Sequence, residues 1–349
     1  MDKKKIVVFF GGCSSEYSVS LESASSVINN LNREKYEPIP IGITESGKWY
    51  YFCGSVDKIK QDTWQEDASC VSCAISPDRG ERKLLLFRGD KVENMVIDAA
   101  FPVMHGRNGE DGTIQGVIEL AGIPLVGCGV LASALCMDKD RAHKLAELNG
   151  VRVPKAMAFG KVYDLHTVLE FAEQTGYPLF VKPVKAGSSY GVTKVQNKEN
   201  LMEAIQLAFQ YDNEVIVEEG IPGFEVGCAV MGKDELTVGE VDEIELAGGF
   251  FDFTEKYTLK TSAIHVPARV DQETSNRLKE TAKLLYKVLG CSGFARVDMF
   301  LTPDKEIVFN EINTIPGFTE HSRYPGMMKA AGISFAEVLE RVVELALEC

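Results

Sequence analysis

The sequence predicts an α/β protein that starts with an open parallel sheet and has more than one domain. The apolar run Lys5–Phe10 has the length of a buried strand and ends at Gly11-Gly12. A helical pattern, Ser18–Ile28, follows this glycine turn, and Ser18 is a suitable N-cap. Because 349 residues exceed one typical core, two or three domains are expected.

The elements after this first unit extend the same pattern to about residue 130. Apolar runs at Tyr36–Ile43 and Met95–Pro102 predict two more strands, and Asp111–Ala121 predicts a helix. The sequence therefore predicts a Rossmann-like domain over residues 1–130. Its glycine turn is not a GxGxxG motif, so the domain is not expected to bind a dinucleotide.

Two further regions are predicted, spanning residues 131–220 and 221–349. The first alternates helices and strands: Asp138–Asn149, Lys155–Phe159, Asp164–Thr175, Pro178–Lys182, Lys198–Gln210 and Glu214–Glu218. The second has strands and helices at Glu225–Met231, Val238–Glu245, Gln272–Leu289 and Ser334–Leu347. It also holds a long stretch with aromatic residues, 247–262, and a loop of that length in a compact domain is usually functional.

Composition and charge exclude several classes of function. The net charge of −14 disfavours binding to nucleic acids or anionic membranes, although a local basic site for phosphates is compatible with it. No segment approaches the ~20 apolar residues of a membrane span, and the first apolar run is too short for a signal peptide. A cytoplasmic protein is therefore expected. The nine cysteines include one CxxC, Cys70–Cys73, so reduced thiols are expected and a zinc site is not.

Two strand-like runs near the C-terminus, Phe294–Phe300 and Ile307–Asn313, carry the strongest functional pattern. Thr302–Glu306 between them has the composition of a turn, so the runs are predicted to pair as a hairpin. A turn centred on Asp304-Lys305 would set residue 298 opposite residue 311 and residue 296 opposite residue 313. The register of this hairpin therefore decides which polar side chains meet.

Four polar side chains then gather on one surface of the hairpin. Strand side chains alternate between faces, so Arg296 and Asp298 share a side, as do Glu311 and Asn313. Two carboxylates and an amide form an all-oxygen site suited to Mg²⁺, which usually also takes substrate phosphates. Arg296 beside them could hold an anion. The alternative is an ordinary hairpin with a solvated polar face.

A segment rich in glycine and serine follows the strand that ends at Lys182. Gly187–Gly191 offers backbone N–H and hydroxyl donors that can fold over a triphosphate, with the lysine as a point charge. The segment is not a P-loop, because GxxxxGK[ST] is absent. A plain turn is an equal alternative.

The end of the strand at Val217 has a second pattern suited to a nucleotide. Val217–Glu225 could bind adenine and ribose through backbone groups of Glu219–Ile221 and through the carboxylate of Glu225. The alternative is an acidic strand end in solvent.

Two more segments place polar groups where a substrate could bind. His105–Gly112 follows a strand at a junction with a helix, where open sheets bind ligands, although a lone loop histidine is often structural. Asn313–Arg323 turns sharply at Pro316-Gly317, which could aim the Gly317 N–H and Ser322 at a substrate.

Taken together, these segments resemble the ATP-grasp carboxylate–amine ligases, specifically the D-alanine–D-alanine ligase family. The markers run nearly end to end: Gly11–Glu16, His105–Thr113, Met137–Lys139, Lys182-Pro183, Gly187–Ser189, Glu255–Tyr257, Arg296–Asp298, Asn310–Asn313 and Pro316-Gly317. The resemblance implies an α/β protein with α+β elements, in which an ATP-grasp fold follows the N-terminal Rossmann-like parallel-sheet domain. Residues 131–220 would be the central ATP-grasp domain with the phosphate loop, and 221–349 the C-terminal one with the metal site and the long loop.

The resemblance also implies which residues bind ATP and metal. The implied ATP-binding residues are Lys139 and Lys182 at the phosphates, Lys256 at the transferred phosphate, Ser189, Glu218, Ile221, Glu225, and Phe250 and Phe300 near adenine. The implied metal ligands are Asp298, Glu311 and Asn313, holding two Mg²⁺ ions, with Mn²⁺ as the alternative ion.

The implied catalytic residues are Glu16, His105, Ser188, Tyr257, Arg296 and Gly317. Glu16 would pair with the ammonium group of the first D-alanine, and Ser188 and Tyr257 would link to Glu16 and close the long loop. ATP would convert the carboxylate to an acyl phosphate, which an amine then attacks. Arg296 and the Gly317 N–H would stabilise the resulting oxyanion, and losing one such donor typically costs about 10²–10³ in rate.

Two features bear on the second substrate. The chain retains Lys256-Tyr257, whereas D-lactate-using members of the family carry a different loop with a histidine, so an amine is implied. Arg323, beside Ser322, is similar to the residue of glycopeptide-resistance ligases, and it would favour a polar second substrate. The resemblance thus implies a D-alanine–D-serine ligase of vancomycin resistance, a homodimer that makes a peptidoglycan precursor.

Three alternatives remain at this stage. The second substrate could be D-alanine, or the chain could be an ATP-grasp ligase for another carboxylate. A non-catalytic small-molecule binding protein is the alternative from a different class. A complete set of phosphate lysines and metal ligands disfavours that last alternative, because a sensor has little need for it.

Overall fold

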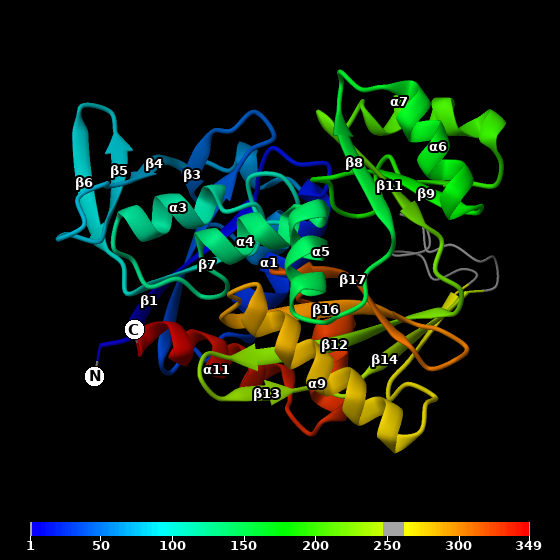
Figure 1. The fold of residues 1–349 in the computed structure, drawn as a ribbon. Coiled ribbons are helices and arrows are strands. Elements are labelled where there is room, and N and C mark those ends of the chain that lie inside the picture. Colours follow the sequence, from blue (N-terminus) through cyan, green and yellow to red (C-terminus); the bar gives the residue numbers. More distant parts are fainter. Residues whose placement is uncertain (1, 247–261, 349) are drawn as a thin grey trace.

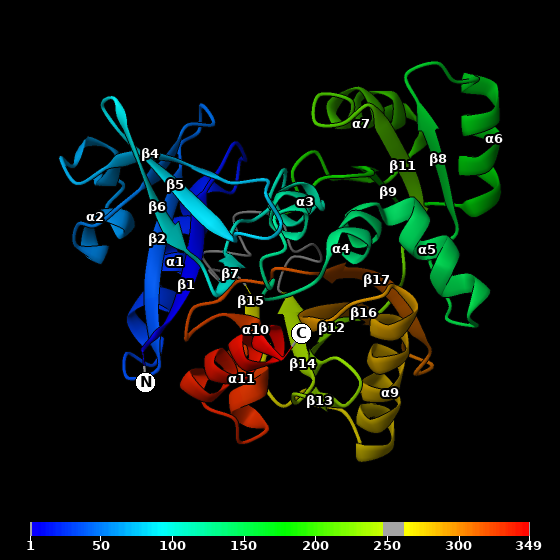
Figure 2. The ribbon, with the colours of Figure 1, turned by 90° about the vertical axis from the view of Figure 1, so that its left-hand side faces the viewer.

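The structure, a computed structural model, describes residues 2–246 and 262–348. Its strands form three sheets that follow one another along the chain. The first sheet lies on one side of the molecule, and the second and third lie together on the other (Figures 1 and 2). The predicted α/β class is confirmed.

The first sheet has seven strands in the order β6-β5-β4-β3-β2-β1-β7. Its centre, β1 (Lys4–Gly11), pairs in parallel with β2 (Tyr36–Ile43) and with β7 (Ala99–Pro102). Apolar side chains of β1 are fully buried beneath α1 (Tyr17–Asn30), and α3 (Thr113–Leu120) packs near β7. The predicted strand, glycine turn and helix are therefore present.

Beyond β2 the sheet is antiparallel, an extension that the sequence pattern does not predict. Its strands are β3 (Trp49–Tyr51), β4 (Val71–Ile75), β5 (Lys83–Arg88) and β6 (Lys91–Val96). The expected single strand Met95–Pro102 is wrong, because the chain leaves β6 at Val96 and enters β7 at Ala99. Asp98 breaks the strand, since its carboxylate accepts hydrogen bonds from the Lys5 N–H at 2.8 Å and the Lys4 ammonium at 2.9 Å.

The start of α1 also differs from the expectation. The helix begins at Tyr17, so Ser18 lies in its first turn and Glu16 occupies the N-cap position. Glu16 makes no side-chain capping bond, because its carboxylate accepts a hydrogen bond from Ser188 Oγ instead. A residue at the end of the helix is thereby directed toward a distant part of the chain.

Shorter helices lie between the strands. They are α2 (Val56–Lys60), the 3₁₀ turns Trp64–Glu66 and Lys198–Asn200, α4 (Val130–Met137) and α5 (Lys139–Leu148). Of these, α4 and α5 connect the first sheet to the second. Asp138 caps α5 by accepting a hydrogen bond from the Arg141 N–H at 3.0 Å, as expected of an N-cap aspartate. This cap sets Lys139 at the first position of the helix.

The second sheet is antiparallel, with the order β10-β9-β11-β8. Its strands are β8 (Ala156–Gly160), β9 (Leu179–Pro183), β10 (Thr193–Val195) and β11 (Glu214–Glu219). α6 (Leu165–Thr175) and α7 (Leu201–Ala208) pack their apolar residues against it. The predictions of strands near 155–159, 178–182 and 214–218 are confirmed.

The third sheet carries the predicted hairpin. Its strands are β12 (Phe224–Gly232), β13 (Leu236–Val238), β14 (Asp242–Leu246), β15 (Ser262–His265), β16 (Gly293–Leu301) and β17 (Ile307–Asn313). Its helices are α9 (Gln272–Val288), α10 (Arg323–Ala330) and α11 (Phe335–Leu347). β12 is central and pairs antiparallel with β13, β14 and β16.

The expected single strand Val238–Glu245 is wrong. The chain returns along β12 as β13, leaves the sheet at residues 239–241, and pairs with β12 again as β14. The break is held by two backbone hydrogen bonds, in which Gly239 N–H donates to Ala229 and Glu240 N–H to Met327. Residues 247–261, which include most of the long aromatic stretch, lie outside the described residues. No described helix is long and apolar enough to cross a membrane.

An aromatic cluster joins the first sheet to the third. Phe294 of β16 packs edge-on against Phe101 of β7 at 5.8 Å, and against Phe318 and Tyr324 at 5.0 and 5.7 Å. All four side chains are buried in one continuous core. This contact fixes how the two sheets lie relative to each other.

Replacing Phe294 by alanine should lower the free energy of unfolding by about 3–5 kcal/mol, since it removes a buried ring at the centre of this cluster. Urea denaturation monitored by circular dichroism measures the loss. The matched control is Phe87→Ala on β5, where the ring is 42% exposed and the expected change is below about 1 kcal/mol. Equal losses in the two variants would contradict the assignment of Phe294 to the core.

Candidate active site

Two adjoining pockets lie where the three sheets meet. Among the predicted residues, the first pocket is lined by Lys139, Lys182, Ser188, Ser189, Glu218, Ile221, Glu225, Phe300 and Glu311. The second is lined by Glu16, His105, Ser188, Arg296, Asn313, Gly317, Ser322 and Arg323. Gly187 and Ser188 line both. Of the predicted site residues that the structure describes, all but Asp298 line one of these pockets. Asp298 is buried behind them. Phe250, Lys256 and Tyr257 lie outside the described residues.

The hairpin of β16 and β17 has the predicted pairing at the polar positions. Arg296 lies opposite Asn313, and Asp298 lies opposite Glu311. The turn itself is shifted, since Thr302 N–H bonds to the Glu306 carbonyl and the loop is centred on one residue, Asp304.

A β-bulge reconciles this turn with the observed pairing. Near the turn Met299 pairs with Phe309, a register that would set Asp298 opposite Asn310. The register changes between Asp298 and Met299, which leaves Asn310 as an extra residue on β17. Bulges of this kind re-aim side chains next to active sites, and here the bulge sets Glu311 opposite Asp298.

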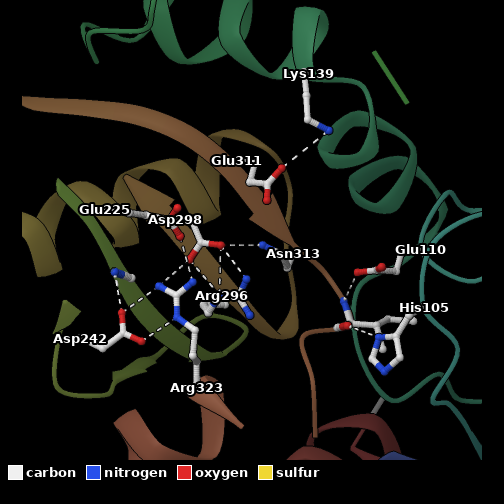
Figure 3. Close-up of polar contacts among 12 residues, drawn as sticks. His105, Glu110, Lys139, Glu225, Asp242, Arg296, Asp298, Glu311, Asn313 and Arg323 are labelled. Atoms are coloured by element: carbon white, nitrogen blue, oxygen red, sulfur yellow. Dashed lines mark hydrogen bonds and ion pairs between the residues drawn. The ribbon is translucent and has the colours of Figure 1, made fainter. Parts of the chain in front are cut away.

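Asp298 is held by cations and an amide (Figure 3). Arg296 binds it through Nε at 2.8 Å and through a terminal nitrogen at 2.6 Å. Asn313 Nδ2 donates to it at 2.9 Å, and Arg323 lies 3.3 Å from its other oxygen. The buried carboxylate is thus held in one orientation with its charge offset.

The donor set fits Mg²⁺ held together with a phosphate chain. Asp298, Glu311 and Asn313 supply hard oxygen ligands from one face of two paired strands. Among the described residues there is no cluster of three or more His, Cys, Asp or Glu suited to a metal. A set of two carboxylates and one amide would draw further oxygens from a substrate and from water.

Arg323 lies in a deeper carboxylate cluster that joins the two pockets (Figure 3). It binds Asp242 through two nitrogens at 2.7 and 2.9 Å and Glu225 at 2.9 Å. Burial disfavours the charge, but Asp242 and Asp298 hold the pKa of Arg323 well above its ordinary value. Asp242 is fully buried and also accepts a hydrogen bond from the Gly227 N–H. Asp242 is a single aspartate within a predicted strand, and nothing in the sequence around it indicates that it binds Arg323. Sequence reasoning therefore does not find it.

The two predicted phosphate lysines converge beneath the glycine–serine loop. Lys139, at the start of α5, donates to the Ala186 carbonyl at 2.8 Å and lies 3.6 Å from Glu311. Lys182, on β9, lies 2.5 Å from Glu218. Both ammonium groups are mostly buried among oxygen atoms, so a phosphate chain entering the pocket would meet them directly.

In the segment Glu219–Ile221, which is predicted to bind the nucleoside, two of the backbone N–H groups are already used within the protein. The N–H groups of Glu219 and Gly220 already donate to the carbonyls of Lys155 and Pro178. In the part of the chain that the structure describes, this leaves the Ile221 N–H to recognise a base. Glu225 and Phe300 line the same pocket.

Glu16 is enclosed by backbone from two directions. Ser188 Oγ donates to its carboxylate, so the expected link between these residues is present. A Cβ on Gly106 would lie 2.4 Å from this carboxylate, and one on Gly187 would lie 2.6 Å from it. Only glycine permits such an approach, so the phosphate loop rests directly on the candidate ammonium-binding group.

His105 and Glu110 hold the segment that contains Gly317. His105 Nδ1 donates to the Ile315 carbonyl at 2.9 Å, while Glu110 accepts from the Ile315 N–H at 3.2 Å. His105 Nε2 then accepts from Ser23 Oγ, which itself accepts from the Phe318 N–H. The segment 315–318 is thus anchored at both ends. These contacts give His105 a positioning role on the Gly317 segment, and Glu110 is a site residue that the sequence reasoning did not single out.

Electrostatics support a neutral His105 in a crowded acidic pocket. Burial lowers the pKa of His105 to about 4. Burial, followed by the charge of Glu16, raises the pKa of Glu110 to about 8. Glu110 is therefore largely neutral near pH 7 and is not an anionic partner for a cationic substrate group.

The neutral His105 should make stability depend on pH. Because its pKa is about 4 when folded and about 6.5 when unfolded, the unfolded chain binds more protons between these values. The stability that neutral His105 contributes is thus fully present above about pH 6.5 and is lost as the pH falls toward 4. Between pH 7.5 and 5, wild type should lose about 2 kcal/mol more than His105→Asn in urea titrations. His166→Asn, at an exposed position of α6, is the control. Equal pH dependence of stability in wild type and His105→Asn would contradict the conclusion that His105 is neutral in the folded protein.

Comparisons with known proteins give a consistent result. The model of the D-ala D-ala ligase N-terminus matches residues 5–128, and that of the C-terminus matches residues 148–344. The vancomycin B-type resistance protein VanB of Enterococcus faecalis is 45% identical, covering 100% of both chains. A D-alanine–D-alanine ligase of Caldicellulosiruptor bescii is 41% identical, covering 100% of this chain and 96% of the relative. The crystal structure of VanG D-Ala:D-Ser ligase from Enterococcus faecalis is 57% identical, with a TM-score of 0.92 over 99% of this chain and 100% of that one.

Proposed function

The chain belongs to the D-alanine–D-alanine ligase family of ATP-dependent ligases, and we propose that it joins D-alanine to D-serine. The product would be a dipeptide for peptidoglycan precursors that confers resistance to vancomycin. Its support is the similarity to VanG D-Ala:D-Ser ligase and to VanB. A homodimer in the cytoplasm is part of the proposal and rests on the family alone.

The observation that carries D-serine specificity is the placement of Arg323. Its guanidinium lines the second pocket beside Ser322 and is fixed by Glu225 and Asp242. Three of the five N–H groups of this arginine are used in hydrogen bonds to Glu225 and Asp242, and Asp298 lies 3.3 Å from one terminal nitrogen. The remaining N–H on the nitrogen that contacts Glu225 can meet a hydroxyl group, and a site built for a hydroxyl discriminates against a substrate that lacks it.

The residues divide the reaction between them. Glu16 binds the ammonium group of D-alanine. The carboxylate of this D-alanine attacks the γ-phosphorus of ATP, so that ADP leaves and a D-alanyl phosphate forms. Lys139 and Lys182 offset charge on the phosphates, and Mg²⁺ held by Asp298, Glu311 and Asn313 would add to this. The amine of D-serine then attacks the acyl carbon, phosphate leaves with the C–O electrons, and the amine proton is lost. Arg296 and the Gly317 N–H stabilise the oxyanion between these steps.

A phosphate-release assay tests the function. With ATP, Mg²⁺ and D-alanine, adding D-serine should stimulate phosphate release more than adding further D-alanine, and D-lactate should have no effect. Glu311→Ala should lower turnover at least 10²-fold, because loss of even an outer-shell partner of a metal costs about 10–100-fold. Glu147→Ala, at an exposed position of α5, is the control. Absence of phosphate release with either D-amino acid would refute the proposal, and a preference for D-alanine would favour the alternative represented by the ligase of Caldicellulosiruptor bescii.

The role of Arg323 needs a test that spares the fold. Arg323→Leu alone would remove the cation that binds the mostly buried carboxylates of Asp242 and Glu225 and lies near Asp298, and breaking such a cluster costs about 3–5 kcal/mol. Arg323→Met in an Asp242→Asn background reduces this penalty. It should lower the ratio of kcat/KM for D-serine over D-alanine by about tenfold or more relative to Asp242→Asn alone. An unchanged ratio would show that Arg323 does not select the second substrate.

A further inference from the structure

His143 is a buried histidine in α5 for which the reaction described above has no use. It lies one turn after Lys139, and residues four apart share a face of a helix. Its side chain reaches between two strands that belong to different sheets, β11 and β17. Nε2 lies 2.8 Å from the carbonyl of Asn310, and Nδ1 lies 3.7 Å from Glu218 Oε1. His143 is 3% exposed and Glu218 is 2% exposed.

The contact to Asn310 decides the orientation of the ring. A carbonyl oxygen can only accept, so Nε2 carries the hydrogen and donates it. The distance from Nδ1 to Glu218 exceeds that of a hydrogen bond. Neither Nδ1 nor Glu218 Oε1 has a hydrogen-bond partner among the described residues. The directed link from His143 therefore runs through Nε2 to Asn310.

Asn310 is the bulge residue that sets the register of the metal strand. It has no partner on β16, so its carbonyl needs a donor from elsewhere, which His143 supplies. The next residue, Glu311, lies opposite Asp298 and 3.6 Å from Lys139. One helix thus supplies both a phosphate lysine and the group that holds the bulge.

We propose that His143 is a positioning residue that holds the Asn310 bulge, so that Glu311 faces both Asp298 and Lys139. This proposal deepens the proposed function, on which it rests, because it concerns the metal ligand of the same site. The competing reading is that His143 merely fills space, since its ring packs edge-on against Phe309 at 5.6 Å. If His143 is a positioning residue, loss of the donor at Nε2 changes Mg²⁺ dependence. If it only fills space, that loss changes only the stability of the fold.

Two amide substitutions separate these readings. His143→Gln places an amide nitrogen near the Nε2 position, whereas His143→Asn places it near Nδ1, out of reach of Asn310. Both replace the ring by a smaller amide. The Mg²⁺ concentration for half-maximal turnover should rise about 10–100-fold in His143→Asn, as for loss of an outer-shell partner, and by less than about threefold in His143→Gln. KM for D-alanine should be unchanged in both.

A binding measurement gives a readout apart from turnover. Calorimetric titration with ADP in EDTA should give the same affinity for wild type, His143→Asn and His143→Gln. With limiting Mg²⁺, the affinity should fall about tenfold in His143→Asn only. His166→Asn, at an exposed position of α6, is the control. All titrations are made below the lowest temperature at which wild type or any of these variants is half unfolded.

Two results would overturn the proposal. One is wild-type Mg²⁺ dependence in His143→Asn, and the other is equal impairment of Mg²⁺ dependence in His143→Gln and His143→Asn. Failure of the proposed function is distinguishable from both. In that case wild type releases no phosphate with either D-amino acid, while the ADP titrations still report on His143.

Discussion

Burial of paired charge is the constraint on which this site depends. Arg296 and Arg323 lie largely out of solvent, and the carboxylates that they bind, Glu225, Asp242 and Asp298, are mostly or fully buried with them. Taking such groups from water is costly, and the cost is offset only where each charge meets a well-placed partner. The cluster therefore permits a single arrangement of β12, β14, β16 and α10. The positions of the side chains on these elements, Glu225, Arg296, Asp298 and Arg323, follow from that arrangement.

The same cluster links the two halves of the chemistry. Glu225 lines the first pocket, where we propose that ATP binds, and Arg323 lines the second, where we propose that D-serine binds; the two side chains are 2.9 Å apart. A movement of Glu225 toward a ribose would change what holds Arg323. Under this proposal, recognition of the second substrate would depend on the nucleotide side of the site.

Local patterns predicted much of this arrangement and failed for identifiable reasons. Alternation along Phe294–Phe300 and Ile307–Asn313, together with a turn centred on Asp304-Lys305, predicted the pairing of Asp298 with Glu311. It could not reveal the bulge at Asn310, because a centred turn and a shifted turn with a bulge give the same pairing. The antiparallel strands from 49 to 96 were missed, since they are short and β6 is mostly exposed, with no regular alternation.

Contacts between distant elements were beyond sequence reasoning. Asp242 and His143 each act through a partner far along the chain, and neither stands in a motif. Glu110 lies inside the segment His105–Gly112, where its acidic side chain was visible but its two backbone partners were not. In each case the signal is burial of a polar group, which only the folded chain displays.

The place where the two pockets meet follows from a glycine, Gly187. Because Gly187 carries no side chain, the glycine–serine loop lies directly on Glu16, and Ser188 of that loop donates to the same carboxylate. Gly187 and Ser188 line both pockets, so a loop that closed over a bound nucleotide would also close the wall around the first amino acid. Under the proposed function, a mixed anhydride formed there would be shielded from water by the loop that binds the phosphates. Phosphate binding would then be coupled to protection of the intermediate through one loop.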